Sequence, residues 1–146
     1  MVVEIREVER VDAQLVEGFG RLIPQLSSTS RSPTAEELQR LLESDTTVLF
    51  AAWEDGTIVG ALTLVVARLP TGIRARIEDV VVDEAFRGRG VAAELSQAAL
   101  RRAAAEGAKT VDLTSRPDRT AANRLYERLR FEKRDTNVYR LRLSGE

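Results

Sequence analysis

The sequence contains no cysteine and no histidine. Their absence excludes disulfide bonds, zinc sites built from cysteine or histidine, thiol nucleophiles and Ser–His–Asp triads. Any acid–base chemistry must therefore be done by aspartate, glutamate, lysine, tyrosine or water. We accordingly expect no metal cofactor.

Long apolar runs and a surplus of basic charge are missing too. No run approaches the roughly 20 apolar residues of a transmembrane helix, and residues 1–10 carry acidic side chains and no hydrophobic block, unlike a signal peptide. The net charge is −1, the pI is about 5.7, and the aromatic residues are one Trp, two Tyr and four Phe. We therefore expect a cytoplasmic protein without a membrane or nucleic-acid partner.

What is present fits one globular domain spanning 1–146: 146 residues, 43% of them hydrophobic and 31% charged. Spacing of the apolar residues predicts α/β structure. A capping box of Thr34 and Glu37 marks a helix start, Asp55-Gly56 marks a hairpin, and Pro24 is expected to end the first helix. The expected helices are 12–23, 34–43, 89–106 and 118–130. The expected strands are 2–8, 46–53, 58–67, 77–82, 110–114, 131–134 and 138–143.

The most informative stretch joins the strand 77–82 to the helix that begins near 89. Glycines open this helix, and a helix N-terminus offers unpaired N–H groups and the positive end of the dipole. Gly88 and Gly90 let a phosphate approach the backbone closely, and Arg87 and Arg89 add positive charge. The pattern predicts a diphosphate site, with a turn that merely caps the helix as the alternative. It is neither a Walker loop nor a dinucleotide fingerprint, because the later residues of those motifs are missing.

Two motifs together resemble the GNAT acetyltransferase superfamily. Arg87-x-x-Gly90-x-Ala92 after a valine-rich strand resembles its acetyl-CoA motif, and the segment 122–131 resembles its later helix, which usually ends leucine-glycine-phenylalanine. The resemblance implies an α/β (α+β) GNAT fold, with a mixed central sheet of six to seven strands, about four helices, and a separation between strands 4 and 5. The chain departs from the family pattern in having Arg119 at a frequent asparagine and Arg130 at the glycine.

The resemblance also implies roles for residues, with acetyl-CoA as the co-substrate. The backbone of the valine run would pair with the pantetheine arm, the loop would hold the diphosphate, and Tyr126 would protonate the departing thiolate. The arm would enter where the strands 77–82 and 110–114 separate at a bulge. The residues assigned to the cofactor are Val80, Val81, Val82, Arg87, Gly88, Arg89, Gly90, Val91 and Ala92. The alternative interpretation makes Tyr126 a core residue that shares one face of its helix with Leu125 and Leu129.

Glu78 and Asp79 are carboxylates within a strand that otherwise resembles core. Burial of an unpaired charge is costly, so such residues indicate a partner or a site. We expect both to bind the acceptor amine and Glu78 to act as the base, with Asp79 or a water relay as alternatives. Adjacent strand residues face opposite sides unless a bulge intervenes. The competing interpretation pairs them with Arg74 or Arg76.

The predicted function is direct transfer of acetyl to a primary amine on a small molecule or peptide. The alternative is a non-catalytic acyl-CoA-binding regulatory module. The run 76–82 is similar to a strand of glucosamine-6-phosphate N-acetyltransferases, which makes an amino-sugar phosphate the alternative acceptor. Relatives often dimerise through their final strands, so 138–143 is a predicted edge or exchange strand of a homodimer.

Overall fold

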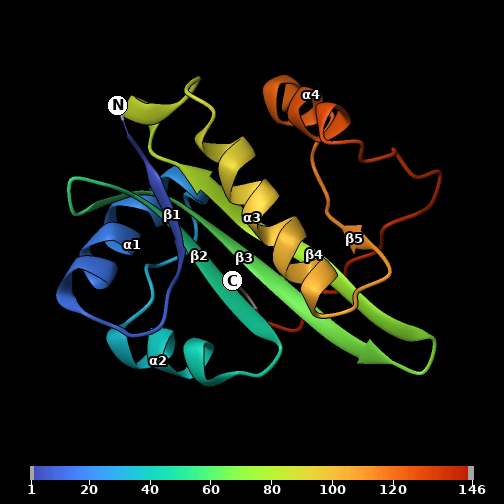
Figure 1. Ribbon diagram of the computed structural model, residues 1–146, viewed down its shortest axis with the longest axis horizontal. Coiled ribbons are helices and arrows are strands. Elements are labelled where there is room, and N and C mark those ends of the chain that lie inside the picture. The colour runs from blue at the N-terminus through green and yellow to red at the C-terminus, as the bar shows by residue number, and fades with distance from the viewer. Residues whose placement is uncertain (1, 145–146) are drawn as a thin grey trace. The chain divides into compact units, whose positions relative to one another are not determined.

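The computed structural model describes residues 2–144 (Figure 1). The chain divides into two compact units, one ending at Leu113 and one beginning at Thr114, and each is described by itself. The prediction of a single domain stays a prediction.

The first unit is built on a mixed sheet in the order β1-β2-β3-β4-β5. Neighbouring strands from β1 to β4 run antiparallel, and β5 runs parallel to β4. The predicted hairpin between β2 and β3 is confirmed, with Asp55 and Gly56 in the left-handed region at φ 48° and 76°. The strands are β1 Glu4–Glu7, β2 Thr47–Glu54, β3 Thr57–Leu69, β4 Gly72–Val82 and β5 Val111–Asp112.

Helices cover both faces of this sheet. Leu15, Phe19 and Leu22 of α1 (Ala13–Leu26) and Leu38 of α2 (Ala35–Glu43) form one core with buried residues of β2, β3 and β4. On the other face α3 (Val91–Ala105) lies across the sheet (Figure 1). Gly60 of β3 lets α3 approach, because a Cβ there would stand 3.2 Å from side-chain atoms of both Leu95 and Val91.

The first helix does not end before Pro24, so that prediction was wrong. It begins after Asp12, whose carboxylate accepts from the Leu15 amide at 2.9 Å, and it continues through Pro24 to Leu26. A proline inside a helix removes one hydrogen bond and crowds the carbonyl four residues earlier. Pro24 lies in the last turn, where few further bonds depend on it, and the Ser27 amide still reaches the Ile23 carbonyl at 2.9 Å.

The second unit contains α4 (Thr120–Arg128), and its described residues form no strand. The predicted strands 131–134 and 138–143 were therefore wrong, and the sheet formed by residues 2–144 has five strands, not six to seven. A strand needs a neighbour for its N–H and C=O groups. The alternation in 138–143 indicates which side chains share a face, but it does not supply a neighbouring strand. Val138 and Leu141 are 77% and 84% exposed.

The predicted α/β fold, with a mixed sheet and four helices, is otherwise confirmed. Among residues 2–144, no helix combines the length and apolar character that crossing a membrane requires.

Candidate functional site

A bulge interrupts β4 inside the valine-rich stretch. Thr63 of β3 pairs with Glu78 and Ala61 pairs with Val81, so both Asp79 and Val80 lie opposite Leu62. Asp79 takes a left-handed backbone conformation at φ 50°, which is uncommon outside glycine. The predicted bulge is thereby confirmed and lies at Asp79–Val80.

The bulge interrupts the alternation of side chains at the two carboxylates, because Asp79 and Val80 together oppose one residue. Through its register Glu78 shares a face with Val81, toward α1. Glu78 Oε2 accepts from Arg76 Nε at 3.1 Å, and both side chains are about half exposed. The ion pair that the competing interpretation expected at Arg76 therefore exists. Desolvation, with the charge of Glu78, raises the pKa of the Asp79 carboxyl above its ordinary value.

The parallel strands β4 and β5 separate after two residue pairs. Ala75 pairs with Val111 and Arg76 pairs with Asp112, and the Ala75 amide donates to the Thr110 carbonyl at 2.9 Å. Beyond Arg76, the edge of β4 that faces β5 has no strand partner among the described residues. The predicted separation of these strands is confirmed. It leaves the edge of β4 at Val80–Val82 without a strand partner among the described residues, although the Val82 carbonyl accepts from Arg87 Nε at 3.1 Å.

The loop after β4 has the features of an anion cradle. Gly88 and Gly90 are left-handed at φ 77° and 81°, and a Cβ at either would meet no atom within 4 Å. The 15-residue helix α3 begins at Val91 without a side-chain cap. Within the described part of the chain, no oxygen accepts from the amides of Gly88, Gly90 or Val91. Unpaired amides beside open space at a helix N-terminus fit the diphosphate of acetyl-CoA.

Both loop arginines lie against the loop itself. Arg87 Nε donates to the Val82 carbonyl at 3.1 Å, across the end of β4. The Arg89 guanidinium lies over the Phe86 ring, 5.2 Å from its centroid. These contacts hold both positive charges against the segment that carries the open amides, and positive charge favours an anion.

Tyr126 belongs to the second unit, and the end of α4 fixes the orientation of its ring. The Phe131 amide donates to the Tyr126 carbonyl at 2.9 Å and the Arg130 amide to the Glu127 carbonyl at 3.0 Å, which is a Schellman motif. The Tyr126 and Phe131 rings pack edge to face, with centroids 5.7 Å apart. Desolvation raises the pKa of the Tyr126 hydroxyl, and the charge of Arg119 opposes part of that shift. The phenol therefore keeps its proton at neutral pH.

Asn123, four residues after the position where the family frequently has an asparagine, has a local structural role. Asn123 Nδ2 donates to the carbonyls of Arg116 and Arg119, each at 2.9 Å, and so closes the loop before α4. Arg119, at the frequent asparagine position of the family, instead places a charge near Tyr126.

The strand, loop and helix of the first unit carry Glu78, Asp79, the valine run and the residues from Arg87 to Ala92 along one continuous stretch of chain. Tyr126 lies in the second unit. Sequence reasoning missed Arg21 and Gln25 of α1, which contact the start of the loop. Their partners lie 62 and 59 residues further along the chain, so no local pattern could have found them.

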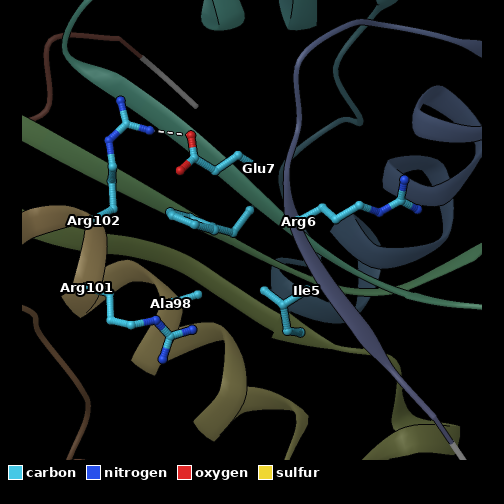
Figure 2. A pocket seen from close by; sticks show the side chains of 7 residues that line it. Ile5, Arg6, Glu7, Ala98, Arg101 and Arg102 are labelled. Atoms are coloured by element: carbon cyan, nitrogen blue, oxygen red, sulfur yellow. Dashed lines mark hydrogen bonds and ion pairs between the residues drawn. The ribbon is translucent and has the colours of Figure 1, made fainter. Parts of the chain in front are cut away.

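A hollow of about 350 Å³ lies elsewhere, between β1 and α3 (Figure 2). None of the predicted site residues lines it. Arg102 is already paired with Glu7 and Glu106, and Arg6 points away, over the Trp53 ring. The lining residues are Ile5, Arg6, Glu7, Phe50, Ala98, Arg101 and Arg102.

Comparison with known proteins places these features in context. The model of the Acetyltransferase (GNAT) family matches residues 15–131. No curated protein matches the sequence. A transcriptional regulator from Bacillus halodurans C-125 is similar in structure, with 25% identity, a TM-score of 0.82, and 97% of this chain and 100% of that one covered.

Two further solved structures share the fold. Glucosamine-6-phosphate N-acetyltransferase from Arabidopsis thaliana has 23% identity and a TM-score of 0.81, with 97% of this chain and 99% of that one covered. AAC(6')-Iy, in complex with the bisubstrate analogue CoA-S-monomethyl-acetylneamine, has 23% identity and a TM-score of 0.78, with 97% and 99% covered.

Proposed function

The chain belongs to the GNAT family of acetyltransferases, and on that premise we propose that it is an N-acetyltransferase that moves acetyl from acetyl-CoA to a primary amine. The observation that supports this most is the open cradle at Gly88 and Gly90, beside strands that part after Arg76. A merely capping turn would need no open space beside both glycines and no unpaired strand edge. A location in the cytoplasm remains part of the proposal.

Acetyl-CoA would supply the acetyl thioester. The amides from Gly88 to Ala92, with the charges of Arg87 and Arg89, would hold its diphosphate. The edge of β4 at Val80–Val82, which has no strand partner among the described residues, would pair with the pantetheine arm in the manner of an added strand. The complex of AAC(6')-Iy with a CoA-containing analogue supports this choice of co-substrate.

The acceptor must lose a proton before it attacks. An amine resembling lysine has a pKa near 10.4, so its deprotonation at pH 7 costs about 4–5 kcal/mol. A positioned base contributes a factor of about 10²–10⁴, which is of the same order. Glu78 would act as this base, and Asp79 would bind the ammonium group. A backbone N–H near Val80 would stabilise the developing oxyanion.

Tyr126 would act as the acid for the departing thiolate. Its raised pKa keeps the proton on the hydroxyl until it is needed. The absence of cysteine supports direct attack of the amine, without an acetylated thiol on the enzyme.

The test is release of free thiol from acetyl-CoA across a panel of primary amines. We expect at least one amine to accelerate release by the natural protein, and Tyr126→Phe to slow that rate by about 10²-fold while CoA still binds. Failure of every amine to accelerate release, with CoA still bound, would establish the alternative, a non-catalytic acyl-CoA-binding module. The structural similarity to a transcriptional regulator is the observation that favours this second candidate.

The acceptor class also remains a proposal. An amino-sugar phosphate is supported by adjacent Glu78 and Asp79 and by the shared fold with glucosamine-6-phosphate N-acetyltransferase. The panel should therefore contain amino sugars with and without a phosphate, a lysine peptide and a simple diamine. Higher kcat/KM for the lysine peptide would identify a peptide acceptor instead.

A homodimer through the residues 138–143 is the remaining part of the proposal. Val138, Tyr139, Leu141 and Leu143 are all more than three-quarters exposed. Apolar side chains gathered on one exposed segment are typical of a surface that associates.

A further inference from the structure

Two side chains of α1, one turn apart, form a clamp on the segment that follows β4. Arg21 Nη1 donates to Asp83 Oδ2 at 3.1 Å, and Arg21 Nη2 donates to the Ile58 carbonyl of β3 at 2.9 Å. One turn further along α1, Gln25 Oε1 accepts from the Glu84 amide at 2.8 Å. Side chain and backbone of the loop start are thus both held by the same helix.

Each part of this clamp is itself held in place. Glu17 Oε1 accepts from Arg21 Nε at 2.7 Å, and Gln25 Nε2 donates to the Arg21 carbonyl at 3.2 Å. The second oxygen of the Asp83 carboxylate accepts from the Ala85 amide at 3.1 Å. Asp83 therefore starts the short 3₁₀ turn Glu84–Phe86 while it is bound to α1.

The clamp holds one end of the loop whose two glycines carry the open amides. Left-handed glycines at positions 88 and 90 have wide conformational freedom, so the direction of their amides depends on what anchors the loop. Helix α3 anchors one end. At the other end only the turn Glu84–Phe86 separates the clamp from Arg87.

We infer that Arg21 and Gln25 are positioning residues for the diphosphate loop, and that they set the affinity for acetyl-CoA without touching it. The inference depends on the proposed function, because it assigns the loop to the diphosphate. Loss of the clamp should then weaken ligands that carry a diphosphate and spare those that lack one. A general loss of structure would weaken both kinds of ligand alike.

The experiment compares the natural protein with Arg21→Gln and Gln25→Ala. Isothermal titration with CoA should give a dissociation constant about tenfold higher for each variant, as expected for one lost polar contact. The KM for acetyl-CoA should rise with it, while kcat/KM for S-acetylpantetheine, which has no diphosphate, stays unchanged. Arg21→Lys keeps a charge beside Asp83 and should restore part of the affinity.

Arg40→Gln on α2 is the matched control, because Arg40 is exposed and its ion pair to Glu36 is long, at 4.0 Å. It should bind CoA like the natural protein. Equal CoA affinity in all variants would overturn the inference, as would an equal loss with both acetyl donors. No CoA binding by the natural protein would overturn the proposed function as well. If Arg21→Gln does not fold, the CoA affinity of Gln25→Ala, which keeps every charge, decides the test by itself.

Discussion

At the scale of the residue, Arg130 has a left-handed backbone at φ 72°, at the C′ position of the motif that ends α4. That conformation costs an L-residue about 1–2 kcal/mol, and glycine avoids the cost but loses about 0.5–1 kcal/mol of backbone entropy. We therefore expect Arg130→Gly to raise the free energy of unfolding by about 0.5–1 kcal/mol. Urea unfolding at unchanged m-value measures this difference.

Arg128→Gly provides the comparison, because it removes the same charge two residues earlier, inside α4. Glycine at a helical position costs about 1 kcal/mol, so this variant should be less stable than the natural protein. Equal shifts for both variants would contradict the argument from backbone conformation.

The two carboxylates of β4 should differ in the kinetic constant that each one controls, kcat or the KM for the amine. If Glu78 is the base, Glu78→Gln lowers kcat by about 10²-fold or more. Asp79→Asn should chiefly raise the KM for the amine, because it removes a charge that binds the ammonium group. Steady-state kinetics with a saturating acetyl donor distinguish these effects, and the opposite result would identify Asp79 as the base. Arg76→Gln, which removes only the ion partner of Glu78, should keep most of kcat.

At the scale of the element, α2 shows how one carboxylate links helix capping to pH. Hydrogen bonds from the Arg31 guanidinium, at 2.8 and 2.9 Å, and from the Thr34 amide, at 2.9 Å, lower the pKa of Glu37 to about 2. The pKa of glutamate in an unfolded chain is about 4.3. Because the folded pKa is the lower one, Glu37 stabilises the fold above about pH 4.3, and this contribution is lost as the pH falls toward 2.

We therefore expect Glu37→Gln to lower the unfolding temperature at pH 6, and this deficit to shrink steadily between pH 5 and pH 3. Thermal unfolding followed by circular dichroism at several pH values measures it. Glu36→Gln is the control, because its side chain is 90% exposed and its ion pair is long. A deficit that is constant with pH would show that Glu37 acts through its shape and not its charge.

The elements also show which signals in the sequence were sufficient. The capping box at Thr34 and the Asp55-Gly56 turn are local, and both formed as predicted. The strand β4 begins earlier than predicted, at Gly72, because exposed Arg74 and Arg76 alternate with buried residues. Strands with distant partners had mixed outcomes: β1 formed at Glu4–Glu7, β5 shrank to Val111–Asp112, and the last two did not form.

At the scale of the whole molecule, the candidate site was predictable where it is contiguous in the chain. The valine run, the two loop glycines and the helix start are adjacent, and family resemblance and backbone physics led to the same residues. The bulge at Asp79–Val80 breaks the alternation that would otherwise put Glu78 and Asp79 on opposite faces. The clamp of Arg21 and Gln25 was not predictable, because it depends on how α1 packs against the end of β4.

Association of two copies is the prediction that belongs to the whole molecule. In an extended backbone Tyr139, Leu141 and Leu143 share one side, and they are 87%, 84% and 93% exposed. Burial of apolar surface contributes about 25 cal/mol per Å², so covering these side chains favours a dimer. We expect light scattering after size exclusion to give twice the chain mass of 16.2 kDa, and Leu141→Lys with Leu143→Lys to give the monomer.

The control for that double variant is Leu69→Lys, at an exposed leucine on the β3–β4 hairpin, which should remain dimeric. Comparison of CoA affinity between the dimer and the Leu141→Lys, Leu143→Lys monomer then separates assembly from ligand binding. Because the cradle at Gly88 and Gly90 lies entirely within the first unit, the monomer should still bind CoA. A natural protein that is monomeric at micromolar concentration would show instead that the exposed segment 138–143 does not join two copies.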